Sequence, residues 1–119
     1  MKIPGPDHPI SIARSSRGVL ARFGDQIIAS SRDALILKES DYPEVTYIPR
    51  QDVNMSLFTR TDRRTHCPYK GEASYFSLKG AGAKGENIAW SYEQPFSSVA
   101  TIKDHLAFYP IVEIEDGGM

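Results

Sequence analysis

The segment ASYFSLKGAGAKGENIAWSYE, residues 73–93, decides the fold class of this chain. Its two ends, Ala73 to Lys79 and Asn87 to Glu93, carry the aromatic residues that favour strands. Between them lies GAGAKGE, residues 80–86, where glycine permits positive φ angles at no steric cost. The pattern predicts a β-hairpin with a flexible loop, in which Ile88, Trp90 and Tyr92 share one face of the returning strand.

Other runs along the chain also have the composition of strands. Gly18 to Phe23 and Gln26 to Ser31 are predicted to form a second hairpin around a Gly24-Asp25 turn, with Val19, Ala21 and Phe23 on one face. Further strands are predicted at residues 34–39 (for which a helical turn stays open), 45–49, 106–110 and 111–115. Short helical pieces are predicted at residues 50–58 and, after Pro95, at residues 96–105.

Together these elements predict a mainly β protein, a compact domain of coiled antiparallel sheets or a barrel with one or two short helical pieces. The chain of 119 residues has the length of one ordinary domain, and we expect a single domain over residues 1–119. The first ten residues contain three prolines and a glycine, which disfavour a helix. Residues 1–16 are therefore predicted to be an extended segment packed on the body of the domain.

The composition limits which cellular compartments and which binding partners are expected. The formal net charge is −1 with mixed signs, which argues against a nucleic-acid or membrane partner because these need a clustered basic face. A single cysteine cannot form an internal disulfide, which favours a reducing compartment, and no apolar run has the length of a signal peptide or a membrane span. We expect a cytoplasmic protein, a monomer or a homodimer, whose partner is an unknown small molecule.

Several motifs, in order, carry a resemblance to a known family. KIPGPDHPISI, YIPRQDV, THCPYKGEASYFSL, AWSYEQP and IKDHLAFYP are similar to domain-of-unknown-function family 427, and the likeness runs from Pro4 to Pro110. The resemblance implies a Mss-four-like fold of coiled β-sheets. Two departures stand out: Ile111-Val112 follow FYP where many relatives have Asp-Arg-Val, and Arg63 and Arg64 add positive charge before the THCPYKG motif.

Two activities linked to such relatives lack the residues they need here. Family members are sometimes labelled nucleotidyltransferase-like, but no Gly-Ser is followed by a spaced acidic pair that would hold magnesium. The Mss-four-like fold is associated with zinc held by two cysteine pairs, which one Cys together with His8, His66 and His105 cannot supply. We therefore predict no metal site and no cofactor.

The CPYKG segment, residues 67–71, holds the candidate chemistry. Pro68 and Gly71 predict a turn that presents Lys70, and Arg50 at the end of another strand is the second cation of a predicted anion site. Cys67 beside these cations is a candidate nucleophile, and Lys70 the other catalytic candidate. The alternatives stay open: Cys67 as a small core residue, and Lys70 and Arg50 as solvated side chains, with Arg50 paired to Asp52.

Tyr75 and Tyr92 complete the predicted ligand site. Equal steps from Ala83 place Tyr75 opposite Ser91, within one residue of Tyr92, so both hydroxyls are predicted near the same pocket. We expect a small-molecule-binding domain for an anionic ligand, whose polar pocket is built from the PR, CPYKG and WSY segments, and catalytic activity stays open. The alternative is a non-catalytic protein-interaction or chaperone-like module.

Overall fold

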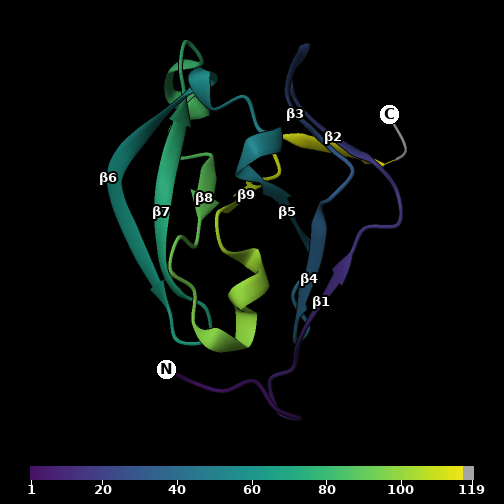
Figure 1. Ribbon diagram of the computed structural model, residues 1–119. Coiled ribbons are helices and arrows are strands. Elements are labelled where there is room, and N and C mark those ends of the chain that lie inside the picture. Colours follow the sequence, from purple (N-terminus) through teal and green to yellow (C-terminus); the bar gives the residue numbers. More distant parts are fainter. Residues whose placement is uncertain (117–119) are drawn as a thin grey trace.

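The computed structural model describes residues 1–116, and its dominant elements are antiparallel strands (Figure 1). The mainly β fold class predicted from the sequence is confirmed. The strands are β1 (Ile10–Arg14), β2 (Val19–Phe23), β3 (Gln26–Ser31), β4 (Leu35–Glu39), β5 (Val45–Pro49), β6 (Phe58–Cys67), β7 (Gly71–Leu78), β8 (Ala89–Ser91), β9 (His105–Phe108) and β10 (Glu113–Asp116). The short 3-10 helices are η1 (Arg50–Asp52), η2 (Met55–Leu57), η3 (Gly82–Gly85) and η4 (Ser97–Ile102).

Two sheets organise these strands. The larger one has seven strands in the order β1-β4-β5-β9-β8-β7-β6, and the smaller has three in the order β10-β2-β3. Both predicted hairpins are present, because β2 pairs with β3 around Gly24 at φ +59, and β7 pairs with β8 across the glycine-rich loop. That loop contains η3, and Gly80 and Gly82 take positive φ there.

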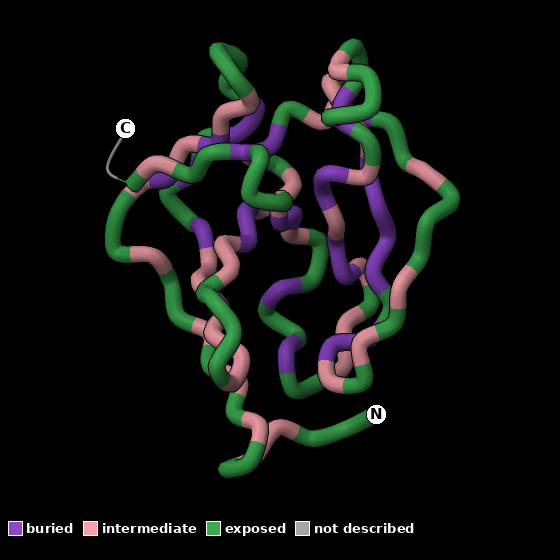
Figure 2. The backbone as a smooth tube through the Cα atoms, turned by 180° about the vertical axis from the view of Figure 1, so that it is seen from behind, coloured by how far each residue is buried: buried purple, intermediate pink, exposed green. Residues whose placement is uncertain are grey.

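The large sheet has a different core on each of its faces. One core cluster joins the small sheet to the large one and contains Val19, Ala21, Ile48, Phe76 and Leu106 among its members. The other lies where η4 packs on the opposite face, and contains Leu37, Tyr47, Tyr75, Val99 and Ile102. Because both faces of this sheet are covered, β7 is buried at four consecutive positions, residues 73–76, and Figure 2 shows long buried stretches in the interior of the molecule.

One facing prediction in the central hairpin is wrong. Ile88 belongs to the core cluster beneath the small sheet, whereas Trp90 packs on the other cluster and Tyr92 is part of it. The reason is local: Asn87 adopts φ +50 and β8 begins only at Ala89, so the alternation of the strand does not extend back to Ile88. No helix among the described residues 1–116 is long and apolar enough to cross a membrane.

Two strands were absent from the sequence interpretation. β1 lies inside the segment predicted as merely extended, and it pairs with β4. β6 is ten residues long and forms one end of the large sheet, with a register irregularity between Arg60 and Arg64. Its sequence FTRTDRRTHC lacks an apolar alternation because most of its side chains are exposed, so hydrophobic periodicity does not reveal it.

Candidate functional site

A cavity of about 250 Å³ opens on the face of the large sheet that η4 covers, between β4–β5 and β7–β8. Aromatic rings form most of its wall, and we call it the tyrosine pocket. The aromatic residues that line it are Tyr42, Tyr47, Tyr75, Trp90, Tyr92 and Tyr109. Glu39 and Lys70 are the charged residues of the lining. A small apolar cavity with a few polar groups is the usual form of a small-molecule site.

The CPYKG turn brings Lys70 into this pocket. Cys67 and Gly71 are paired at the ends of β6 and β7, so residues 68–70 form the predicted turn. Gly71 has φ +111, and the backbone N–H of Phe96 donates to the Lys70 carbonyl at 3.0 Å, which anchors the turn to the segment before η4. The Lys70 side chain is only 10% exposed, so it is not the solvated side chain of the alternative interpretation.

Glu39 is the partner of Lys70 and the centre of a three-residue charge network. Lys70 Nζ donates a hydrogen bond to Glu39 Oε1, and Glu39 Oε2 lies 2.8 Å from His8 Nε2. Burial alone would raise the pKa of Glu39, but the hydrogen bonds and charges of Lys70 and His8 outweigh it, and the pKa lies below its ordinary value. Glu39 is therefore a carboxylate at neutral pH.

The N-terminal segment holds His8 in this network. The His8 ring stacks on Tyr69 with ring centroids 4.0 Å apart and an angle of 6° between the planes. The backbone N–H of Lys2 donates to the Pro68 carbonyl at 2.7 Å, and the Lys2 ammonium lies 5.9 Å from the Tyr69 ring centroid. The residues before β1 therefore lie against the outer side of the CPYKG turn.

The tyrosine hydroxyls of the pocket have different surroundings. Tyr75 Oη lies 2.8 Å from Thr65 Oγ1, and Tyr47 Oη accepts a long hydrogen bond of 3.4 Å from Trp90 Nε1. Tyr92 Oη makes no hydrogen bond within residues 1–116, and the Lys70 ammonium lies 5.9 Å from the Tyr92 ring centroid. Burial raises the pKa of Tyr47 and of Tyr92, so both hydroxyls keep their protons at neutral pH and can donate hydrogen bonds.

Tyr75 and Tyr92 meet in the pocket by a register that differs from the predicted one. Tyr75 is paired with Trp90 and not with Ser91, because η3 makes the connecting loop asymmetric about Ala83. Tyr92 lies two positions beyond Trp90 and belongs to the same core cluster as Tyr75. The predicted pairing is therefore wrong by one residue, yet both tyrosines line the pocket.

Arg50 lies on the opposite face of the sheet. Its guanidinium lies 5.3 Å from the Phe76 ring centroid, and its Nη1 is 3.0 Å from Glu93 Oε2. Tyr75 and Phe76 are neighbours on β7 and point to opposite sides, so a group over Phe76 is separated from the tyrosine pocket by the sheet. The structure therefore does not bring Arg50 together with Lys70, and the ion pair of Arg50 is with Glu93 and not with Asp52.

Cys67 is half-buried and packs against the core cluster that surrounds the tyrosine pocket, without lining the cavity. The two cations predicted to activate its thiol are engaged elsewhere, Lys70 by Glu39 and Arg50 by Glu93. The surroundings of Cys67 are those of a small core residue, which was the alternative interpretation.

Several residues of the pocket were not among the predicted site residues: Glu39, Tyr42, Tyr47 and Tyr109. Glu39 and Lys70 are 31 positions apart, and no local spacing relates them. The one signal in the sequence is that Glu39 ends the apolar run ALILKE, where a strand presents its last side chain at the rim of a core. Within residues 1–116 there is no group of three or more His, Cys, Asp or Glu side chains placed to hold a metal ion.

A comparison of the chain with known protein families identifies the family to which it belongs. The model of domain-of-unknown-function family 427 (DUF427) matches residues 11–116, so the chain belongs to this family. No curated protein matches the chain.

Proposed function

We propose that this protein binds a small molecule in the tyrosine pocket, with Lys70 as the donor to an acidic or other oxygen acceptor group of the ligand. The observation that carries the proposal is a buried lysine at the wall of a cavity. Lys70 is 8% exposed, and fully buried lysines are rare unless they are paired or functional. Here the ammonium is paired with Glu39, and Lys70 is one of the residues that line the cavity.

The hydrogen-bonding capacity of Lys70 supports this role. An ammonium has three N–H donors, and within residues 1–116 the Lys70 ammonium makes one hydrogen bond, to Glu39. The Tyr92 ring face takes part of the remaining charge. A ligand carboxylate, phosphate or carbonyl oxygen would complete the set. Glu39, held by His8 on its other oxygen, keeps the Lys70 side chain in place for this contact.

The aromatic lining supports a compact organic ligand over a bare ion. The rings of Tyr47, Tyr92 and Trp90 offer apolar faces, and the Tyr92 hydroxyl is free to bond to a ligand rather than to residues 1–116. Such walls bind the carbon skeleton of a ligand, while a few polar groups fix its orientation. We place the protein in the cytoplasm, because its one cysteine is unpaired.

Trp90 gives a direct test, because its indole lines the pocket and it is the only tryptophan of the chain. The native protein is purified without denaturant, and native mass spectrometry identifies any retained small molecule. That molecule, or a panel of small carboxylates and phosphate esters where none is retained, is then titrated while the Trp90 fluorescence is followed. We expect saturable quenching in the wild type and at least about tenfold weaker binding in Lys70→Met, since a lost charge-assisted hydrogen bond costs about 1.5–3 kcal/mol.

Lys79→Met is the matched control, because it removes the same charge from a lysine that does not line the pocket and donates to the Ser56 carbonyl. Tyr92→Phe is a second variant that removes only one hydroxyl. Equal binding by wild type and Lys70→Met, or no small molecule that quenches Trp90, would overturn the proposal. Recovery of a stoichiometric protein partner in place of a small molecule would favour the interaction module instead.

A further inference from the structure

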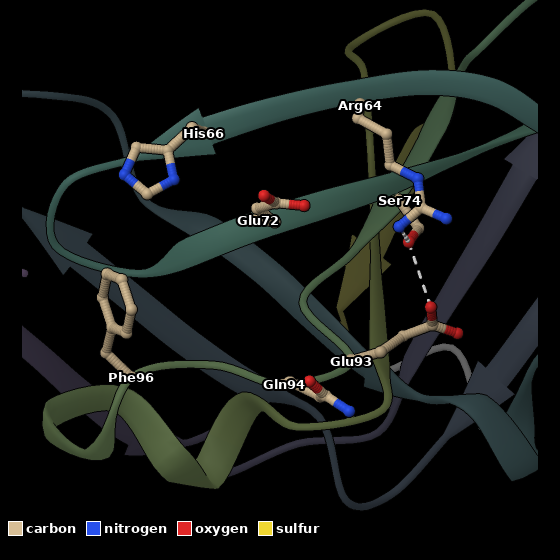
Figure 3. Close-up of a pocket in the computed structure, with 7 residues that line it drawn as sticks. All are labelled: Arg64, His66, Glu72, Ser74, Glu93, Gln94 and Phe96. Atoms are coloured by element: carbon tan, nitrogen blue, oxygen red, sulfur yellow. Dashed lines mark hydrogen bonds between the residues drawn. The ribbon is translucent and has the colours of Figure 1, made fainter.

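A second groove lies on the other face of β7, away from the tyrosine pocket (Figure 3). It has a volume of about 510 Å³ and runs between the β6–β7 hairpin and the segment that leads from β8 to η4. Its lining is mostly polar: Arg64, His66, Glu72, Ser74, Glu93, Gln94 and Phe96. Figure 3 shows Arg64 and Glu93 directed toward Ser74 from two sides, with Gln94 and Phe96 on the segment that faces β7.

Arg64 is the arginine of the groove lining, and two further arginines outside the lining pair with Glu93. Arg60 donates to both oxygens of Glu93, at 2.9 and 2.6 Å, and Arg50 donates to Glu93 Oε2 at 3.0 Å. Arg64 lies beside them and makes no ion pair within the described residues, and its guanidinium donates only to Ser74 Oγ, at 3.1 Å. One carboxylate, Glu93, therefore faces three guanidinium groups.

The charge balance around the groove depends on arginines that lie outside its lining. Glu72 is the other carboxylate of the lining, and it stands in β7 opposite His66 of β6. The lining alone has one arginine and two glutamates, a net charge of −1 with His66 neutral, and the sum becomes +1 when Arg50 and Arg60, which pair with Glu93 outside the lining, are counted. An anionic ligand would therefore be attracted to the Arg64 end, where the cation has no carboxylate of its own.

Unsatisfied buried donors occur on two residues that neighbour the groove lining, Arg50 next to Glu93 and Ser91 next to Ser74. Arg50 Nε, Arg50 Nη2 and Ser91 Oγ are buried and have no hydrogen-bond partner within residues 1–116. Ser91 is fully buried and is paired with Ser74 across β7 and β8, so both serines are on the Glu93 side of the sheet. Buried donors are almost always satisfied in folded proteins, so a cluster without acceptors indicates that an ion or water belongs nearby.

We propose that this groove binds a tetrahedral oxyanion, a phosphate or sulfate group, centred on the Arg64 guanidinium. The planar fork of an arginine presents two parallel N–H groups to two oxygens of such an anion. The Gln94 amide supplies a neutral donor beside Arg64. The Ser74 hydroxyl accepts from Arg64 and donates to Glu93, and Arg50 and Arg60 place further positive charge on the other side of Glu93. The Phe96 ring, in edge contact with His66 at 6.1 Å between centroids, gives an apolar surface for an organic group attached to the anion.

The test uses inorganic phosphate, sulfate, acetate and phenyl phosphate as probes, at constant ionic strength. Binding is followed by the amide chemical shifts of ¹⁵N-labelled protein. We expect phosphate and sulfate to shift the amides around Arg64, Ser74 and Gln94 saturably, and acetate to bind more weakly because it is planar. Tighter binding of phenyl phosphate than of inorganic phosphate would identify a phosphate ester as the source of the group, and equal binding a free ion.

Arg63 supplies a matched control on the same strand. Its guanidinium lies 4.9 Å from the Tyr75 ring centroid, on the other face of the sheet, and it does not line the groove. Arg64→Gln and Arg63→Gln therefore remove the same charge from adjacent positions. We expect Arg64→Gln to weaken phosphate binding at least about tenfold and Arg63→Gln less than about twofold.

Equal losses in the two variants would show nonspecific attraction to net charge and would overturn the proposal. So would the absence of a saturable shift at tens of millimolar phosphate in the wild type. Thermal melting of each variant checks that it is folded, and Ser74→Ala gives a second reading of the site without changing its charge.

Discussion

The two faces of β7 carry the same kind of charge arrangement in different surroundings. On one face Glu39 is held by His8 and Lys70, and on the other Glu93 is held by Arg50, Arg60 and Ser74. The side chains of Lys70 and Glu39 are 10% and 15% exposed, whereas those of Arg60 and Glu93 are 45% and 26% exposed. Each face therefore has a glutamate paired with basic side chains, and the two pairs differ in their exposure to water.

That difference appears in the two carboxyl groups. The hydrogen bond from Arg60 lowers the pKa of Glu93 to about 2, with Ser74 and Arg50 adding to the effect and partial burial opposing it. For Glu39, burial is the largest single influence and raises the pKa. The hydrogen bonds and charges of Lys70 and His8 together outweigh it, so the net pKa is still lowered. Burial therefore opposes the attraction between Glu39 and its cations. If either Glu39 or Lys70 is removed, the other is left as a buried, unpaired charge, which is costly, whereas the more exposed Glu93 side chain can be solvated by water.

The largest expected effect is at the buried network. Glu39→Gln leaves the Lys70 ammonium without its carboxylate, and we expect the free energy of unfolding to fall by roughly 2–4 kcal/mol. Urea denaturation at neutral pH measures it. The double variant Glu39→Gln, Lys70→Met should recover a good part of the loss, because it removes the unpaired charge as well. A double variant no more stable than Glu39→Gln would contradict the view that the buried charge is the cause.

A smaller loss is expected on the arginine face. Glu93→Gln removes the carboxylate that Arg50 and Arg60 share, and we expect a loss of about 1–2 kcal/mol, because these side chains are partly solvated. The same urea titration gives the value. If Glu93→Gln lowers the free energy of unfolding more than Glu39→Gln does, the comparison is wrong, because the more exposed network would then contribute more to stability.

The pH dependence sharpens the same comparison. The pKa of Glu93 is lowered to about 2 in the folded protein, against about 4.3 for an ordinary glutamate. Its contribution to stability is therefore complete above about pH 5 and is lost as the pH falls toward 2. We expect the stability difference between wild type and Glu93→Gln to shrink over that interval. A difference that stays constant from pH 6 to pH 3 would show that Glu93 is not held as a carboxylate.

The smallest effects separate two hydroxyls of the tyrosine pocket. Tyr75→Phe removes the hydrogen bond with Thr65 and should cost about 1 kcal/mol. Tyr92→Phe removes a hydroxyl that makes no hydrogen bond within residues 1–116, so we expect a change within about 0.5 kcal/mol. Thermal melting compares the two variants, and equal losses would indicate that the Tyr92 hydroxyl has a partner in the folded protein.

The sequence predicted those parts of the fold that depend on local chemistry. The glycine loop after β7, the Gly24-Asp25 turn and the CPYKG turn were all predicted correctly, because glycine and proline restrict the backbone wherever they occur. β6 was missed because its side chains face solvent and leave no apolar pattern. Charged exposed strands carry little of the signal that hydrophobic periodicity detects.

The candidate site was predicted less completely than the fold. Lys70, Tyr75 and Tyr92 line one pocket, but Arg50 follows Pro49 onto the other face, and the side on which it emerges depends on the pairing of β5 with β9. Glu39 was missed because its contact with Lys70 joins two strands that are distant in the sequence. Which carboxylate neutralises which cation is decided by the tertiary arrangement, which residue spacing does not encode.

The irregular register of β6 has a consequence for the chain in crowded solution. A ten-residue strand at the end of a sheet presents unpaired backbone groups that could recruit a strand of another molecule and start fibril growth. Between Arg60 and Arg64 the register with β7 shifts, and Arg60, Asp62, Arg63 and Arg64 are exposed along this edge. The register shift interrupts the row of backbone groups with which another strand could pair. The arginines of two copies would also repel each other, so these exposed charges disfavour self-assembly.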